Sequence, residues 1–246
     1  MKHRLHASVL PLAMTLFIGL WGCESSTEPV TEGTLSLSSS YSVAPAPAAR
    51  VIGSAGPVAE ITITRARFVL RDIKYKSATE DSLTFKAAPF VLQLDLTGAS
   101  QTVSSIPVKF GSYRRIEFDV HRVEQPEIDA LPAAEQVQFG EFLADEKYSS
   151  IIERTYTPTG GSAVSFTYRS KVDAKQKVDL NPELVIAEGS TEVNTTMLIS
   201  SEGWFKDSSG SIVDPTDTNN EGIIDENLKA SIRVFKDNNK DGSKDS

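Results

Sequence analysis

Residues 60–76, EITITRARFVLRDIKYK, decide the fold. Ile61 and Ile63 alternate with threonine, and Phe68 and Leu70 continue the alternation on positions of the opposite parity. A period of two is typical of a β-strand that buries one face. The change of parity between the two pairs predicts a β-bulge or bend. The stretch therefore predicts a long β-strand with an irregularity near its middle.

The same period recurs on both sides of this stretch, separated by turns rich in Gly, Pro, Asn and Ser. Further strands are predicted around residues 35–43, 83–85, 90–96, 113–122, 150–156, 164–168, 178–180, 184–186, 193–199 and 228–235. Many short strands with such turns favour a mainly β protein, an antiparallel β-sandwich of immunoglobulin-like or transthyretin-like type. One short helix or structured loop is expected within residues 127–147, where Pro132 can begin a helix and Gly140 weakens it.

The domain organisation follows from these predicted elements. Residues 34–125 are expected to form a β-sandwich domain. Residues 126–246 are expected to form a second β region that ends in Asp/Asn-Gly loops. The length allows one large all-β domain or two packed β subdomains.

The N-terminus has the layout of an export signal. Lys2, His3 and Arg4 precede an apolar run from Ala7 to Leu20. This run is shorter than the roughly 20 residues that span a bilayer, so a secretory signal is favoured over a permanent transmembrane helix.

The signal ends with Leu20-Trp21-Gly22-Cys23, which resembles the lipobox of bacterial lipoproteins. The resemblance implies that residues 1–22 are removed as a signal peptide and that Cys23 carries lipid, which anchors the chain to a membrane. Glu24 follows the cysteine where an inner-membrane retention signal has Asp, so the outer membrane is the expected destination. Residues 23–33, polar and poor in apolar side chains, are expected to be a flexible tether. The alternative is a buried structural cysteine.

Composition limits the classes of partner. Cys23 is the only cysteine, so the mature chain is expected to hold together without a disulfide. Removal of residues 1–22 takes away Lys2 and Arg4 and leaves 23 basic against 33 acidic residues, a net charge of −10. An acidic protein does not accumulate on phosphate backbones, so nucleic acid is not an expected partner.

Three short segments give a further resemblance. They are Leu35-Ser36-Leu37, then Ile61-Thr62-Ile63 with Val69-Leu70, and finally Gly111-Ser112-Tyr113 leading into Ile116-Glu117-Phe118. Together they resemble a bacterial lipoprotein β-sandwich domain of unknown function over residues 33–123. The resemblance implies the fold and the cellular location, and it supplies no activity.

Two copies of the pattern D-x-N-x-[DE]-G-x-x-D lie near the C-terminus, twenty residues apart. Oxygen-bearing residues at positions one, three, five, seven and nine, with Gly at six, match the first part of an EF-hand calcium loop. The pattern also resembles the calcium loops of dockerin-like modules. The predicted Ca²⁺ ligands are Asp217, Asn219, Glu221, the Ile223 carbonyl and Asp225 in the first copy, and Asp237, Asn239, Asp241, the Ser243 carbonyl and Asp245 in the second.

The two copies also depart from a full calcium loop. Position twelve, which normally carries a bidentate acid, is Leu228 in the first copy, and the sequence ends at Ser246 before that position in the second. Fewer ligands predict weak binding, on the order of 10⁻⁴–10⁻³ M. The alternative is that Asp, Asn and Gly only form turns in an acidic tail. Trp204-Phe205 and Phe235 are expected to anchor the loops to the sandwich.

The sequence carries no motif of a known catalytic site. His121 is the only histidine after signal removal, which excludes zinc motifs with several histidines, and it is expected to be exposed on a strand. No G-x-S-x-G motif is present. The expected function is non-enzymatic: a lipid-anchored envelope protein that binds a protein or glycan, mediates adhesion or serves as a scaffold. The alternatives are a glycan hydrolase that uses paired carboxylates and a purely structural lipoprotein.

Overall fold

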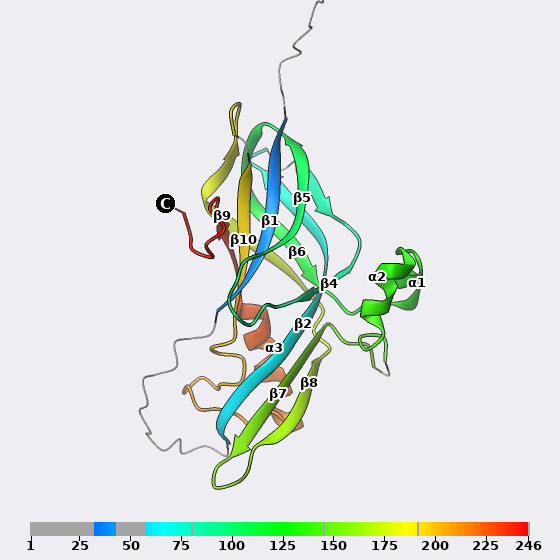
Figure 1. The fold of residues 1–246 in the computed structure, drawn as a ribbon, viewed down its shortest axis with the longest axis vertical. Helices are drawn as coiled ribbons and strands as arrows, with labels where there is room; N and C mark the ends of the chain where they lie inside the picture. The colour runs from blue at the N-terminus through cyan, green and yellow to red at the C-terminus, as the bar shows by residue number, and fades with distance from the viewer. Residues whose placement is uncertain (1–31, 43–57, 80, 145, 191, 246) are drawn as a thin grey trace, which may run out of the picture.

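The computed structural model describes residues 32–42, 58–79, 81–144, 146–190 and 192–245. These residues form a mainly β fold of two sheets with a few short helices, and most strand pairs are antiparallel (Figure 1). The prediction of a mainly antiparallel fold with two packed sheets is therefore confirmed. The two sheets share one hydrophobic core.

The smaller sheet has four strands in the order β11-β10-β1-β5. Its strands are β1 (Glu32–Ser42), β5 (Gln101–Lys109), β10 (Val193–Ser200) and β11 (Ile232–Lys236). β1 and β10 run parallel, in register from Leu35 opposite Val193 to Ser42 opposite Ser200. This pair is the parallel exception among the strand pairs of the described residues, which are otherwise antiparallel. A parallel pair requires a long crossover, and here the crossover contains the entire larger sheet.

The larger sheet has the order β8-β7-β2-β6-β9, and β3 and β4 also pair with β2. Its strands are β2 (Val58–Ser77), β3 (Ser82–Lys86), β4 (Phe90–Gln93), β6 (Gly111–Val120), β7 (Ser150–Pro158), β8 (Val164–Ser170) and β9 (Ala174–Ile186). β2 extends along much of the molecule and pairs first with β7 and then with β6 (Figure 1). It therefore connects the two halves of this sheet.

The irregularity predicted in β2 is confirmed. Pairing with β7 shifts register between Ile63 and Arg65, where the apolar alternation changes parity. A second shift, against β6, lies between Arg71 and Lys74, and Asp72 within it has φ 53°. These bulges change which face each segment of the strand presents.

The middle of β2 is buried on both faces. Phe68 and Leu70 belong to the core between the sheets, whereas Val69 belongs to a second cluster on the opposite face. That second cluster includes Ile128 of α1 (Gln125–Asp129) and Phe139 of the 3₁₀ turn η1 (Val137–Phe139), whereas α2 (Ala133–Gln136) between them buries no residue. Three short helical pieces thus stand where one short helix or a structured loop was expected.

The C-terminal segment contributes apolar side chains to the main core. Trp204 has no exposed surface, and its ring lies 5.7 Å from that of Phe68 in an edge-to-face arrangement. The 3₁₀ turn η2 (Thr218–Asn220) and helix α3 (Glu221–Ala230) follow, and α3 buries Ile224 and Leu228. Leu228 was expected to begin the last strand. It lies in α3 instead, and the strand begins at Ile232.

Strands from both predicted regions share each sheet. β1 and β5 pair with or adjoin β10 and β11 in one sheet, and β2 and β6 pair with β7 and β9 in the other. β1 begins at Glu32, so the last two residues assigned to the tether belong to a strand. No helix in the described ranges is long and apolar enough to cross a membrane.

Candidate functional site

The predicted lipidation residue, Cys23, lies outside the described residues, as do the predicted signal of residues 1–22 and the tether up to residue 31. Glu32, the first described residue, begins β1 at one pole of the molecule (Figure 1).

The second Asp/Asn motif, residues 237–245, forms a loop directly after β11. Asp237 has no exposed surface. Its carboxylate accepts the Thr196 hydroxyl at 2.6 Å on one oxygen. It also accepts the Gly242 amide at 3.0 Å on that oxygen and the Asp241 amide at 3.1 Å on the other. A buried carboxylate needs such donors, so Asp237 fixes the loop to β10.

The backbone of this loop has two left-handed residues. Lys240 has φ 57° and Gly242 has φ 80°. A Cβ on Gly242 would stand 3.1 Å from the Ser40 hydroxyl oxygen, so glycine is favoured both by its conformation and by its close approach to β1. The Asp245 amide donates to the Lys236 carbonyl at 2.9 Å and closes the loop.

The side chains of the other predicted ligands Asn239, Asp241 and Asp245 bond within the loop. Asp241 accepts the Ser243 amide at 2.7 Å and the Asn239 side-chain amide at 2.8 Å. The hydrogen bond from the Ser243 amide, followed by that from Asn239, holds the pKa of Asp241 below its ordinary value. Asp245 accepts the Asn238 amide at 2.8 Å. The five ligand residues predicted for this motif therefore lie in one closed loop.

The loop covers polar side chains on the outer face of the smaller sheet. Asn194 donates its side-chain amide to the Asp237 carbonyl at 2.8 Å, and its own carbonyl oxygen accepts the Ser38 hydroxyl at 3.0 Å. The outward polar residues of β1 and β10 are at most 6 % exposed; they are Ser36, Ser38, Ser40, Asn194 and Thr196. The alternating polar residues of β1 and β10 would suggest a solvent-exposed face. In the structure this face is buried beneath the C-terminal loop.

The donor set of the loop determines which ion it could hold. Within the described residues, no three His, Cys, Asp or Glu side chains form a ready-made metal-binding group. The predicted set for the loop also includes the Asn239 amide oxygen and the Ser243 carbonyl. Calcium accepts amide and carbonyl oxygens together with carboxylates. The loop therefore suits a hard cation and lacks the nitrogen or sulfur ligands typical of structural zinc sites.

The first motif has a different conformation. Asp217 caps η2 by accepting the Asn219 amide, and Glu221, Ile223 and Asp225 lie in α3. Ile223 is 40 % exposed. Residues 217–225 therefore do not form the expected closed loop: Asp217 and Asn219 lie at η2, and the other three predicted ligands lie along α3.

Asp225 has other partners in this helix. Its Oδ1 accepts the Ser170 hydroxyl at 2.7 Å and the Tyr168 hydroxyl at 2.9 Å, which fastens α3 to β8. The signal for the helix was present in the sequence: Ile224 and Leu228, spaced by four, form the buried face of one helical turn. The resemblance to a calcium loop obscured it.

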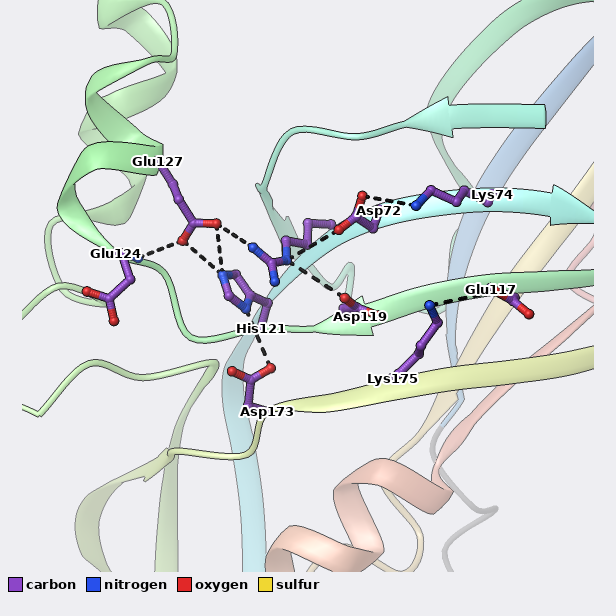
Figure 2. A network of polar contacts seen from close by, with 10 residues as sticks. Asp72, Lys74, Glu117, Asp119, His121, Glu124, Glu127, Asp173 and Lys175 are labelled. Atoms are coloured by element: carbon purple, nitrogen blue, oxygen red, sulfur yellow. Dashed lines mark hydrogen bonds and ion pairs between the residues drawn. The ribbon is translucent and has the colours of Figure 1, made fainter. Parts of the chain in front are cut away.

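His121 was expected to be an exposed strand residue, and this expectation is wrong. It follows the last residue of β6 and is only 6 % exposed. Its Nε2 lies 2.9 and 3.1 Å from the two carboxylate oxygens of Glu127, and its Nδ1 lies 3.5 Å from Oδ1 of Asp173 (Figure 2). The helical segment after β6 folds back and covers the ring.

Glu127 connects this histidine to a wider charge network. It accepts the Glu124 amide at 2.8 Å as part of a capping box of α1, and it pairs with Arg71. Burial raises the pKa of Glu127, but the hydrogen bonds from His121 and the Glu124 amide, with the electrostatic attraction of His121 and Arg71, outweigh burial and lower it. Arg71 also approaches Asp72 and Asp119.

A polar cavity of about 540 Å³ lies beside this network. Its walls are formed by His121, Arg122, Glu124, Glu146, Lys147 and Asp173. Sequence patterns could not reveal it, because the residues come from three separate segments that meet at the end of β6 and the start of β9. No protein-family model, curated protein or solved structure matches the chain.

Proposed function

We propose that this protein is a lipid-anchored, non-enzymatic β-sandwich protein of the bacterial cell envelope with a binding or scaffolding role. Cys23 holds it at the outer membrane, and Ca²⁺ stabilises the loop formed by residues 237–245. A protein or glycan of the envelope is the partner class. The observation that carries the calcium part is the closed loop around buried Asp237.

The loop is suited to calcium by its charge and its shape. Asp237, Asp241 and Asp245 concentrate negative charge, which a divalent cation would neutralise. Each carboxylate oxygen has two lone pairs, so Oδ1 of Asp237, which accepts one hydrogen bond, keeps acceptor capacity for an ion, whereas Oδ2 already accepts two. The left-handed Lys240 and Gly242 turn the chain tightly enough for alternate side chains to approach one another. Few ligands imply millimolar affinity, which suits an extracytoplasmic compartment.

The position of the loop links the ion to the membrane attachment. The loop packs against β1 at Ser40 and against β10 at Asn194 and Thr196. β1 is the strand that continues into the tether. An extended chain of nine residues reaches about 30 Å, so the pole at Glu32 would stay close to the bilayer. Calcium would therefore stabilise the sheet through which the fold is attached.

The calcium part is tested by titrating CaCl₂ into the chain from residue 23 with Cys23→Ser, followed by isothermal calorimetry. A saturable heat at millimolar calcium is expected. Asp241→Asn removes charge from position five of the loop and should weaken binding about tenfold, whereas Glu221→Gln, at position five of the helical copy, should leave it unchanged. Equal affinity in Asp241→Asn and the parent chain would reject the loop as the site.

The anchor is tested separately by membrane fractionation of the full chain. Cys23→Ser should move the protein from the membrane fraction to the periplasmic soluble fraction. Unchanged fractionation would reject lipidation while leaving the calcium result untouched. Hydrolysis of envelope glycan by the purified protein would instead favour the carboxylate hydrolase class.

A further inference from the structure

A cavity of about 430 Å³ lies between the first half of β2 and the segment that follows β10. Its volume lies in the range of small-molecule sites, about 300–1,000 Å³. The apolar part of its wall is formed by Ile61, Ile63, Leu96, Phe205 and Ile212. Apolar walls with a few polar groups are typical of ligand pockets, so the cavity suits a small molecule with an apolar body.

A buried cation adjoins this wall. Arg154 stands opposite Ile63 where β7 pairs with β2, and residues paired in this way point to the same face of the sheet. The guanidinium carbon of Arg154 lies 4.0 Å from the centre of the Phe205 ring. Two residues of the cavity wall are thus direct neighbours of the Arg154 side chain, and Phe205 both lines the cavity and covers the guanidinium.

The guanidinium lacks the acceptors that its charge requires. Its three nitrogens are buried and have no hydrogen-bond partner among the described residues. The buried Arg67, by contrast, pairs a terminal nitrogen with Glu141 and Glu153. Aromatic rings attract the face of a guanidinium, but they accept none of its in-plane N–H donors. A carboxylate would satisfy these donors, because it matches the guanidinium fork in charge and in geometry.

We propose that the cavity binds a small amphipathic carboxylate, with its apolar tail against Ile61 and Ile63 and its carboxylate paired with Arg154. The ring of Phe205 must turn aside for the two charged groups to meet, since it now covers the guanidinium. Side-chain rotamer changes of this kind are common on binding. The site is independent of the proposed calcium loop and of the lipid anchor.

The charges around the cavity are compatible with an anionic head group. Lys206 lines the cavity and supplies a second positive charge. The carboxylate in the lining, Glu202, is exposed, so solvent and salt screen its charge. Asp214 attracts Arg154 electrostatically, but its Oδ1 accepts the amide and the hydroxyl of Thr216 instead. The donors of Arg154 therefore remain available to a ligand.

The experiment titrates sodium octanoate into the chain from residue 23 with Cys23→Ser, by calorimetry at pH 7, with 1-octanol as the uncharged probe of equal length. Octanoate should bind at one saturable site, at least tenfold more tightly than octanol. Arg154→Met, which removes an unpaired buried charge and is expected to fold, should abolish this preference. Arg233→Met, an exposed arginine of β11, should retain it. Absence of saturable octanoate binding, or equal octanoate affinity in Arg154→Met and the parent chain, would overturn the proposal.

A second measurement locates the ligand in the Cys23→Ser chain itself. The Nε–H resonance of Arg154, identified by its loss in Arg154→Met, is observed by ¹H–¹⁵N NMR. The rings of Phe205 and Phe166 lie against the guanidinium and should shield this proton. Octanoate should move the resonance downfield, because the Phe205 ring leaves and a carboxylate accepts, whereas octanol should not. A resonance that stays in place at saturating octanoate would contradict the pairing with Arg154.

Discussion

The Thr196 hydroxyl donates to Oδ2 of Asp237 at 2.6 Å, and both residues have no exposed surface. This contact joins the middle of β10 to the first residue of the C-terminal loop. The other donors to the Asp237 carboxylate are backbone amides of the loop itself. Thr196 is thus the side chain of the sheet that satisfies the buried carboxylate.

Thr196→Val should therefore destabilise the fold by about 1–3 kcal/mol, since the isosteric side chain leaves a buried carboxylate short of one donor. Urea unfolding measures this change. Thr216→Val is the matched control, because Thr216 donates to Asp214 at 2.7 Å in an exposed turn. Its effect should stay within about 0.5 kcal/mol. Equal losses in the two variants would contradict the assigned role of Asp237.

The two copies of the Asp/Asn motif should respond oppositely to the same substitution. Gly242→Ala places a Cβ in a left-handed residue 3.1 Å from the Ser40 hydroxyl oxygen, and should cost about 1 kcal/mol or more. Gly222→Ala lies in exposed helix with open space around its Cβ, and should stabilise by up to about 1 kcal/mol. Chemical denaturation of both variants tests this. A stabilising Gly242→Ala would show that the second motif does not form the described loop.

Arg154 is a buried charge that has aromatic rings as its neighbours. Its side chain is 2 % exposed, and none of its three guanidinium nitrogens has a hydrogen-bond partner among the described residues. The guanidinium carbon lies 4.0 Å from the centre of the Phe205 ring and 4.5 Å from that of Phe166. Burial lowers the pKa of Arg154 to about 9, so it remains charged at neutral pH.

Arg154→Met should raise stability at pH 7 by about 1–2 kcal/mol, because an apolar side chain removes the cost of an unpaired buried charge. Arg154→Lys should lower stability, because an ammonium group cannot stack on the aromatic rings as the planar guanidinium does. Above pH 9 the folded wild type releases this proton before the unfolded chain does, so wild-type stability gains relative to Arg154→Met. Urea titrations at pH 7 and pH 10 measure the difference. A gap that widens at pH 10 would contradict this assignment.

Glu127 should make the free energy of unfolding decrease at acidic pH. Its folded-state pKa is lowered, so the stabilisation it supplies is present above the ordinary carboxyl pKa and is lost as pH falls through the folded-state value. Glu127→Gln should cost about 1–3 kcal/mol at pH 7 and progressively less as pH is lowered below about 4.5. A pH-independent difference between the two chains would indicate that the Glu127 charge is not involved.

The sequence predicted the features that follow from the local alternation of apolar and polar residues, namely most strands and the bulge in β2. The bulge between Ile63 and Arg65 was predictable because each side chain of a strand reports its own face. The strands of both sheets were mostly located for the same reason. The parallel pairing of β1 with β10 was not predictable, because register between strands so distant in sequence depends on tertiary packing.

In the candidate sites, too, local conformation was predictable from the sequence, whereas burial by distant segments was not. The closed loop at Asp237 followed from residue spacing, but burial of Ser38 and Asn194 beneath it did not, since polar side chains on alternate positions indicate a solvated face. The first motif became helical because Ile224 and Leu228 bury one face against the core. His121 appeared exposed because its covering segment, which contains Glu127, follows it through a reversal that has no periodic signal.

The most direct test of the account is the melting temperature of the Cys23→Ser chain against calcium concentration. For a dissociation constant near 1 mM, 10 mM calcium should add about 1.4 kcal/mol and raise the melting temperature by about 3–6 °C. Glu221→Gln should retain the rise, and Asp241→Asn should lose most of it. No rise at 10 mM calcium, or the same rise in Asp241→Asn, would contradict the claim that residues 237–245 bind Ca²⁺.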